Sequence, residues 1–489
     1  MGVSQRMKRM LLALGTLLLL LSPPGPSLAA APYEGYIYSY WTEATPSPEA
    51  YLPVRLISGR TLGIGDWNNP QDLYVTRDGH IYVLDSGNSR IVVLDSGWNV
   101  VRQITGFTKG GAEERFNLPE GLFVTEQGHL YVADTENRRL VELDEHGRFV
   151  REIGAPESEV LKDGFQYFPR KVAVDRAGRI FVVARGVYEG IIELDPDGEF
   201  MGFMGTNRVT VDPWEYMWKR LATRAQREQL VRFIPTEFNN LDLDPDGFLY
   251  ATNQEKNTPR PIQKLNPSGN DVLRREGYGP PRGDLQFAYR GEFSGSSLLI
   301  DVDVNDYGVY SVLDSNRGRI FTYNEDGSLL YVFGKIGKQF GTFKSPVALD
   351  RVGENIAVLD RDMGQITLFQ PTRFGELVNE ANRLYSIGQH DASAEVWKEV
   401  LKYDANYEMA YVGVGKALLR EGKNKEALGY LKLGYDRKYY SKAFERYRKE
   451  VLREHFGAIM TGLVALAVGW AVLLAVWKYR KRRLKANAA

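Results

Sequence analysis

The order of apolar and polar positions divides the chain into regions with different periods. From about residue 50 to residue 370, short apolar runs alternate with turns containing glycine, asparagine or aspartate, a pattern typical of β-strands. Beyond residue 371 the apolar positions recur every three or four residues, which predicts amphipathic helices. Two longer apolar runs, at residues 10–21 and 456–477, fit neither pattern.

The strand region contains an internal repeat. Residues 79–95 read GHIYVLDSGNSRIVVLD, and residues 128–144 read GHLYVADTENRRLVELD. Such a copy is a supersecondary unit that must stack on its neighbours to bury its faces. More divergent copies follow the same order of strands and turns, and they begin near Pro169, Phe238, Ile300 and Pro346.

Six copies of about four short strands predict a mainly β fold, a six-bladed β-propeller. The sixth copy ends at Phe369 without a fourth strand, while residues 51–59 precede the first copy with the pattern of one. We therefore expect this N-terminal strand to complete the last blade and close the ring, which removes an open sheet edge.

These copies resemble NHL repeats, whose pattern runs from a proline through Gly-x-Ile-Tyr-Val-x-Asp to Asn-x-Arg. The resemblance spans residues 33–371, is specific in the first two copies, and implies a six-bladed TolB-like propeller over residues 32–372. We interpret the recurring Asp85, Asn88 and Arg90 as a structural turn, because aspartate accepts bonds from turn amides and arginine can pair with it. A helical insertion is predicted within the propeller at residues 212–232.

Residues 373–454 predict a helical unit. The segments LYSIG (384–388) and LLREG (418–422) lie 34 residues apart, and this helix-turn-helix spacing resembles the tetratricopeptide repeat. Two copies are fewer than such repeats need for independent stability. We expect the unit to pack on the propeller or to be capped by the next helix.

The two ends of the chain predict export and anchoring. Basic residues, the apolar run and small residues make residues 1–31 a secretory signal peptide, with an uncleaved anchor as the alternative. Residues 455–477 are long enough to span a bilayer as a helix. The basic tail at 478–489 predicts a cytoplasmic C-terminus, so the protein is expected to be single-pass in the cell membrane with its bulk extracytoplasmic.

The amino-acid composition excludes some classes of partner and of catalysis. Lysine plus arginine equals aspartate plus glutamate at 62 each, so no global charge favours nucleic acid as a partner. The chain has no cysteine, which excludes thiol catalysis, and its five histidines form no cluster with metal-ligand spacing.

The residues that differ between blades around the inner ring are the candidate ligand-binding residues. Aligning the copies on their glycine places polar side chains at equivalent positions of the innermost strands. Asp242 and Asp303 occupy positions where the first two copies have Tyr74 and Phe123, and two carboxylates there would raise one another's pKa or share a cation. The full candidate set is Asp72, Glu120, Arg170, Lys171, Asn239, Asn240, Asp242, Asp301 and Asp303.

The function expected from these features is binding and scaffolding for a protein or saccharide ligand outside the membrane, with no cofactor. Six-bladed relatives include calcium-dependent lactonases, so the resemblance leaves open a hydrolase or lyase with calcium held by Asp242, Asp303 and Asn239. The competing interpretation is that these acids accept bonds from neighbouring backbone amides and stiffen the channel. The positions of these side chains in the structure distinguish the calcium-site interpretation from the structural one.

Overall fold

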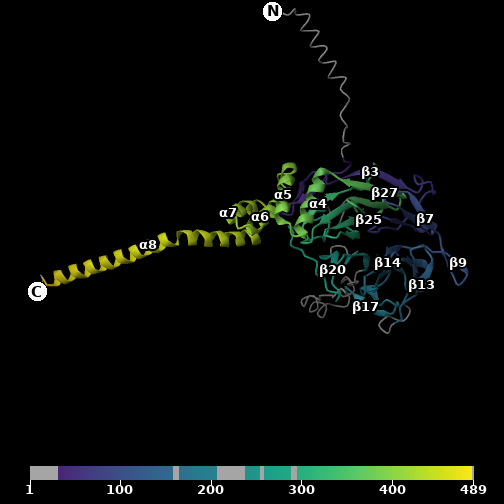
Figure 1. Ribbon diagram of the computed structural model, residues 1–489, viewed down its shortest axis with the longest axis horizontal. Helices are drawn as coiled ribbons and strands as arrows, with labels where there is room; N and C mark the ends of the chain where they lie inside the picture. Colours follow the sequence, from purple (N-terminus) through teal and green to yellow (C-terminus); the bar gives the residue numbers. More distant parts are fainter. Residues whose placement is uncertain (1–30, 158–164, 206–236, 254–257, 288–294, 487–489) are drawn as a thin grey trace, which may run out of the picture.

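A computed structural model describes residues 31–157, 165–205, 237–253, 258–287 and 295–486. The predicted signal peptide, except for Ala31, and the predicted insertion at 212–232 lie outside the described residues. Five helices follow the sheets along the chain, and Figure 1 shows that they lie to one side of them.

The sheets form six blades, as the repeat predicts, with consecutive strands paired antiparallel in each. Blade one comprises β4 (Asp72–Val75), β5 (Ile81–Asp85), β6 (Arg90–Leu94) and β7 (Val100–Ile104). Blade two comprises β10 (Gly121–Val124), β11 (Leu130–Asp134), β12 (Arg139–Leu143) and β13 (Phe149–Ile153), and the hairpin β8 (Phe107–Lys109) and β9 (Ala112–Glu114) precedes it. Blade three comprises β14 (Pro169–Val174), β15 (Ile180–Ala184), β16 (Ile191–Leu194) and β17 (Phe200–Met204).

The remaining three blades depart from four consecutive strands. Blade four has β18 (Phe238–Leu243), β19 (Leu249–Asn253) and β20 (Ile262–Leu265). Blade five has β21 (Leu299–Val304), β22 (Tyr310–Asp314), β23 (Arg319–Tyr323) and β24 (Leu329–Phe333), extended by β1 (Tyr36–Tyr38) and β2 (Ala44–Pro46). Blade six has β25 (Pro346–Val352), β26 (Asn355–Asp360), β27 (Gln365–Pro371) and the N-terminal strand β3 (Tyr51–Ser58).

The expected closure of the ring is confirmed. β3 pairs antiparallel with β27, from Ser58 opposite Gln365 to Tyr51 opposite Pro371. Ile57 of β3 is 1% exposed and packs in a hydrophobic cluster shared by blades six and one, whereas Val54 on the same strand is 47% exposed. The N-terminal strand therefore provides both the missing hydrogen bonds and part of the core between the last and first blades.

Blade four lacks the fourth strand that the repeat predicts among the described residues. Backbone and side chains of residues 271–275 cover the outer edge of β20 instead. The amide of Val272 donates to the carbonyl of Lys264 at 2.7 Å, the Asp271 carboxylate accepts from the amide of Lys264 at 3.3 Å, and Arg275 donates to the carbonyl of Ile262 at 3.0 Å. Asp271 and Arg275 form an ion pair at 2.8 Å. Covering the edge in this way satisfies backbone groups that another strand would otherwise pair.

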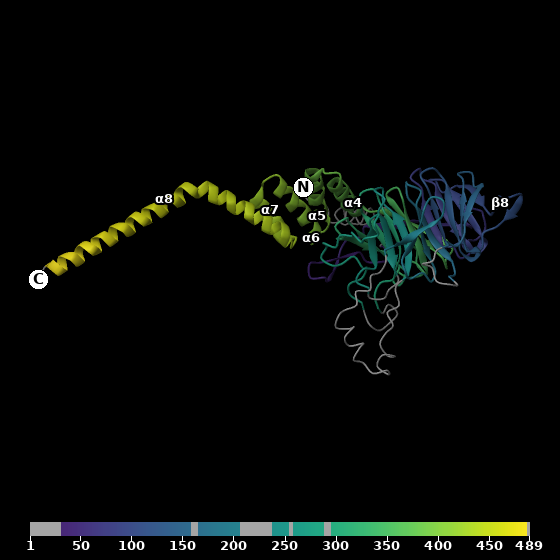
Figure 2. The ribbon, with the colours of Figure 1, turned by 90° about the horizontal axis from the view of Figure 1, so that it is seen from below.

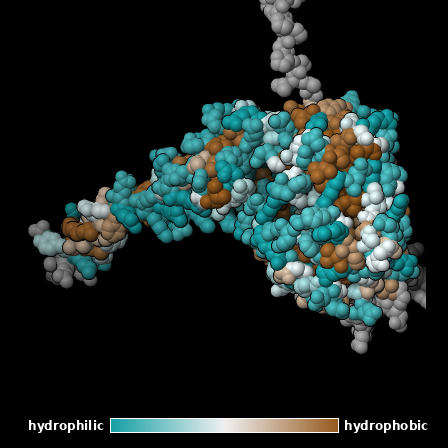
Figure 3. Space-filling view, turned by 45° about the vertical axis from the view of Figure 1, so that its right-hand side comes forward, coloured by the Kyte–Doolittle hydropathy of each residue, from teal (hydrophilic) through white to brown (hydrophobic). Residues whose placement is uncertain are grey.

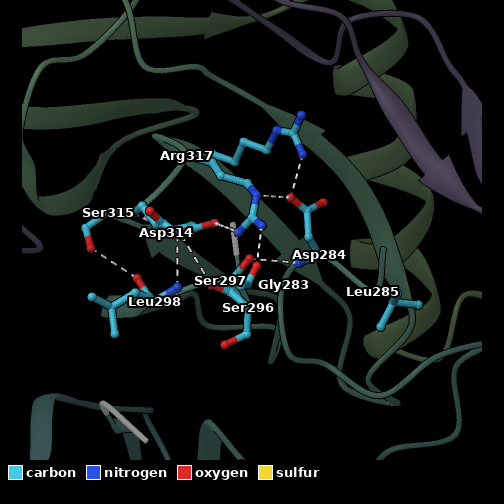
Figure 4. A network of polar contacts seen from close by, with 12 residues as sticks. Gly283, Asp284, Leu285, Ser296, Ser297, Leu298, Asp314, Ser315 and Arg317 are labelled. Atoms are coloured by element: carbon cyan, nitrogen blue, oxygen red, sulfur yellow. Dashed lines mark hydrogen bonds and ion pairs between the residues drawn. The ribbon is translucent and has the colours of Figure 1, made fainter. Parts of the chain in front are cut away.

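Blade five is fastened to the N-terminal hairpin through a buried carboxylate. Asp284 is 3% exposed and pairs with Arg319 at 2.5 Å and with Arg317 at 3.1 Å. The hydroxyl groups of Tyr36 and Tyr38, both on β1, also donate to it. Figure 4 shows Asp284 and Arg317 beside Asp314 at the end of β22. A buried charge held by two guanidinium groups and two hydroxyl groups fixes β1 against blade five.

The helices are α4 (Arg373–Ser386), α5 (His390–Tyr403), α6 (Glu408–Arg420), α7 (Asn424–Leu433) and α8 (Arg437–Ala486). Each of the first four packs on the next along the chain, and a single hydrophobic cluster joins them to blades five and six. Polar contacts cross the same boundary: the Tyr407 hydroxyl donates to the carbonyl of Leu330 at 2.7 Å, and the Tyr331 hydroxyl donates to Asn379 at 2.7 Å. The helical unit therefore packs on the propeller, which is one of the two arrangements expected from the sequence.

Helix α8 differs from the sequence expectation, which separated a segment ending near Glu454 from the apolar run. The structure has one continuous helix of 50 residues. Among the described residues it is the one helix long and apolar enough to cross a membrane. Figure 2 shows it extending away from the rest of the molecule, and Figure 3 shows apolar side chains gathered toward its far end beyond a hydrophilic stretch.

Closure by β3 predicts different costs for two substitutions in the same strand. Ile57→Ala should lower the free energy of unfolding by about 2–5 kcal/mol, because it leaves a cavity between blades six and one. Val54→Ala, at an exposed position, should change it by less than about 0.5 kcal/mol. Denaturant titration of both variants measures the difference. An equal loss of free energy of unfolding in the two variants would mean that β3 does not contribute to the core between blades six and one.

Candidate functional site in the central channel

The innermost strand of each blade places polar side chains around the axis of the ring. These strands are β4, β10, β14, β18, β21 and β25, and each contacts the innermost strands of its neighbours. Their register with the second strands defines three levels of equivalent positions. The candidate residues predicted from the sequence lie on all three levels.

At the first level, a carboxylate lies between two guanidinium groups. Glu120 accepts from Arg170 at 2.7 Å and from Arg185 at 2.6 Å. Asn239 at the equivalent position of blade four is turned to the backbone, because its side-chain amide donates to the carbonyl of Leu299 at 3.0 Å. This level borders a cavity of about 330 Å³ at one mouth of the channel.

At the second level, an ion pair crosses an entire blade. Lys171 of blade three pairs with Asp72 of blade one at 2.5 Å. The intervening blade has Gly121 at this level, and a Cβ there would lie 2.2 Å from the carbonyl oxygen of Arg170. The absence of a side chain at Gly121 therefore lets Lys171 reach Asp72. On the other side of the ring, the Asn240 amide donates to Asp301.

At the third level, three carboxylates occupy equivalent positions in consecutive blades. Asp242, Asp303 and Asp350 lie opposite Tyr250, Ser311 and Ala357, respectively. Arg351 donates to Asp303 at 2.7 Å and provides the nearby positive charge. Burial and mutual repulsion are thus concentrated on one side of the channel.

Asp350 and Arg351 were missed by the sequence analysis. The alignment used the turn glycine between the first two strands, and in blade six this turn is a two-residue hairpin, with Val352 opposite Asn355. In blade one the corresponding turn is longer, with Val75 opposite Ile81. Aligning the strands themselves, rather than the glycine, would have placed Asp350 beside Asp242 and Asp303.

The inner carboxylates bind the backbone of the next blade in a recurring way. Asp72 accepts from the amide of Leu122, Asp242 from Val304, Asp301 from Leu349 and Asp350 from Val75, at 2.6–2.9 Å. Hydrogen bonds from backbone amides to a charged carboxylate are stronger than neutral ones. These four side chains therefore fasten neighbouring blades at the axis, which agrees with the structural interpretation of the inner acids.

Burial raises the pKa values of these carboxylates. For Asp242 the pKa rises to about 7, because burial and the charge of Asp303 outweigh the amides of Val304 and Leu243. Burial, followed by the charges of Asp303 and Asp242, raises the pKa of Asp350. Burial raises the pKa of Asp303 as well, against the opposing effect of Arg351. The charge of Asp303 thus raises the pKa of Asp242, and the charges of both raise the pKa of Asp350.

The proposed calcium ligands are engaged elsewhere. Both oxygens of Asp242 accept backbone amides, from Leu243 and Val304, and Asp303 is paired with Arg351. Asn239 bonds to the backbone, as described above. Among the described residues, no group of three histidine, cysteine, aspartate or glutamate side chains is arranged to hold a metal ion. The arrangement supplies structural acceptors rather than an open set of oxygen ligands.

The turn motif of the repeat is structural, as expected. Asp85 is fully buried and accepts from Asn88 at 2.8 Å and from Arg90 at 2.7 Å. It also accepts from the amide of Asn68 at 2.7 Å, which ties the turn to the segment before the first strand. Asp134 repeats these contacts in blade two.

The two ends of the channel are lined by different ionisable side chains. The cavity at the first level is lined by three cationic side chains and one carboxylate. The larger cavity at the third level, of about 850 Å³, is lined by eight carboxylates and three cations. Tyr74 and Phe123, whose ring centres are 5.1 Å apart, form part of the wall of this acidic cavity.

Comparisons with known proteins agree with the fold. The model of the NHL repeat matches residues 68–94 and 116–143, which contain the specific first and second copies. Together with the six sheets, this match defines the chain as a β-propeller protein with NHL repeats. A search of the curated proteins finds no match.

Solved structures give distant likenesses. Virginiamycin B lyase from Staphylococcus aureus is 10% identical, covers 65% of this chain and 98% of its own, and has a TM-score of 0.41. A protein of unknown function from Bacteroides thetaiotaomicron is 14% identical, covers 63% of this chain and 70% of its own, and has a TM-score of 0.38. Likeness at this level carries no information about the chemistry of the channel.

The raised pKa of Asp242 predicts a pH-dependent stability. Its pKa in the folded protein, about 7, lies above the ordinary 3.8, so the folded state binds a proton that the unfolded state releases. The free energy of unfolding should therefore fall as the pH rises from 5 to 7, by about 2 kcal/mol from this group. Asp242→Asn should remove that part of the pH dependence.

The measurement is denaturant unfolding at pH 5, 6 and 7 for the wild type, Asp242→Asn and a control, Asp197→Asn, on an exposed turn. The comparison uses the slope with pH, because replacing the carboxylate by an amide also changes hydrogen bonds at every pH. Identical slopes for the wild type and Asp242→Asn would contradict the raised pKa.

Proposed function

We propose that this protein is a membrane-anchored, extracytoplasmic binding protein in which the propeller and the helical unit present a rigid surface to a ligand. The observation that carries the proposal is the continuous hydrophobic cluster that joins blades five and six to the helices. A shared core makes the two parts one body, and helix α8 continues from that body into the apolar segment. Such an arrangement suits presentation at a membrane surface more than independent motion of two domains.

The helical unit supports a scaffolding role. Helices α4 to α7 form two hairpins with the 34-residue spacing seen in the sequence, and we interpret them as tetratricopeptide-like repeats. The N-terminal hairpin braces them, because the amide of Tyr40 donates to Glu408 at 2.7 Å and the Ser47 hydroxyl donates to Asp404 at 3.0 Å. The candidate ligand is a protein or a saccharide.

The orientation in the membrane follows from the predicted signal peptide. Basic residues flank the apolar part of α8 on both sides, with seven lysines and arginines at 437–455 and six in the tail at 478–489. The positive-inside tendency alone therefore does not choose a side. Export directed by residues 1–31 places the propeller outside and the tail in the cytoplasm.

A calcium-dependent hydrolase or lyase is the less favoured function. Its ligands would have to leave the backbone amides and Arg351 that they now bind, at a cost of about 1–3 kcal/mol for each buried group left unpaired. We expect millimolar calcium to leave the melting temperature of the full chain unchanged relative to magnesium or to a chelator. A calcium-specific rise of several degrees would revive the metal hypothesis.

Anchoring by α8 predicts the fate of a truncated chain. A protein ending at His455 keeps the propeller, α4 to α7 and the part of α8 that packs on α7, so it should fold and appear in the soluble extracytoplasmic fraction. The full chain should stay in the membrane fraction after an alkaline wash, because about 20 apolar residues are buried in lipid. Fractionation followed by immunoblotting measures both.

The matched control is the full chain with its tail cations replaced by glutamine, which keeps the apolar segment and should remain in the membrane. Retention of the truncated protein in the washed membrane would contradict anchoring by α8 and would favour an uncleaved N-terminal anchor.

A further inference from the structure

We propose that the basic mouth of the channel binds an organic anion, a carboxylate or phosphate group attached to an apolar body. The basic mouth is the cavity of about 330 Å³ at the first level of the ring, and its charged lining residues are Arg170, Lys171, Arg361 and Glu120. The proposal rests on the proposed binding function and specifies the chemistry of one ligand.

Lys171 is paired with Asp72, so the cations of the basic mouth that are open to a ligand are Arg170 and Arg361. Glu120 is shared by Arg170 and Arg185, and Arg185 also reaches Glu136 at 3.4 Å. Among the described residues Arg170 donates through Nε alone, and its terminal amino groups are left for another acceptor. Guanidinium groups in this state bind carboxylate and phosphate with good geometry.

A third cation lies across the mouth. Arg361, at the end of β26, donates to the Ser345 hydroxyl at 2.9 Å, and its contact with Asp362 is long, at 3.4 Å. Its side chain is 40% exposed. Arg170 and Arg361 come from blades three and six, on opposite sides of the ring, so an anion between them would be held from both sides.

The rest of the cavity wall indicates that the anion carries an apolar part. Ile300, Pro346 and Val347 line the cavity on the side of blades five and six, and the hydroxyl groups of Ser315 and Ser345 lie among them. Apolar surface beside a few convergent charged groups is the usual composition of a small-molecule site. Inorganic phosphate would use the charges and leave this wall exposed to water.

The acidic cavity at the opposite end fixes the direction of entry. Its three cations, Arg77, Lys171 and Arg351, are each paired with a carboxylate, so it offers an anion less than the basic mouth does. The belt formed by Asp72, Lys171, Asn240 and Asp301 lies between the two cavities. The site is therefore a one-sided pocket for anions, entered from the first level.

Ligand-observed NMR titration of the full chain in detergent, at low ionic strength, tests the proposal with four probes. Benzoate and phenyl phosphate carry an anion on an apolar ring, benzamide is the neutral counterpart of benzoate, and inorganic phosphate lacks the ring. Both aromatic anions should bind at least about tenfold more tightly than benzamide, since a hydrogen bond to a charged group contributes that much. Inorganic phosphate should bind more weakly than phenyl phosphate.

Arg170→Gln and Arg361→Gln should each weaken benzoate binding at least about tenfold, and Arg176→Gln should leave it unchanged. Arg176 is the matched control, since it is an exposed arginine that pairs with Glu126 at the border of a different cavity. Glu120 keeps Arg185 as a partner in Arg170→Gln, so that variant retains a compensated carboxylate. Melting temperatures within a few degrees of the wild type would confirm that both variants fold.

Any of three results with the aromatic probes would overturn the proposal: no binding of either aromatic anion at millimolar concentration, equal binding of benzamide and benzoate, or unchanged binding in both arginine variants. Tighter binding of inorganic phosphate than of phenyl phosphate would also overturn it, by showing that the apolar wall contributes nothing. Membrane fractionation tests the proposed anchoring independently. A protein that stays in the membrane but binds none of these probes would contradict the proposed ligand and leave the proposed anchoring unaffected.

Discussion

The pairing of β3 with β27 is the constraint on which the rest of the structure depends. It joins a strand that begins at Tyr51 to one that ends at Pro371, and so converts a row of blades into a ring. The same pairing starts the helical unit, because Thr372 caps α4 by accepting from the amide of Gly375 and bonds back to Glu49 through its hydroxyl. The same segment of chain therefore closes the ring and attaches the helices to it.

At the axis, the second recurring device is a carboxylate that accepts an amide of the next blade. It explains how acids survive beside one another in a buried channel, because each charge is stabilised by backbone donors even as burial raises its pKa. The inner acids are therefore engaged in structural hydrogen bonds. Sites for a ligand are then found where charge is left over, at the mouth around Arg170 and Arg361.

Much of this architecture was predictable, because each copy of the repeat has the same order of strands and turns. The copies at Gly79 and Gly128 predicted the strands, the turn around Asp85, and the closing strand. Local exceptions were not predictable. The shorter hairpin of blade six displaced Asp350 in the alignment, and a short segment around Asp271 and Arg275 replaced a strand in blade four. Long-range pairs such as Lys171 with Asp72 were also hidden, since they depend on the missing side chain of Gly121. The candidate residues Asp242 and Asp303 were placed correctly on one level, but their partners could be known only from the fold.

Hydrogen–deuterium exchange of the full chain tests most directly whether the N-terminal strand, the ring and the helices are one cooperative body. The account predicts that amides of β3, β27 and α4 exchange slowly and together with those of the central strand β26, since all of them open only when the ring opens. Early exchange of β3 and α4, while β26 stays protected, would contradict it by showing that the ring is stable without its closing strand and that the helices are a separate unit.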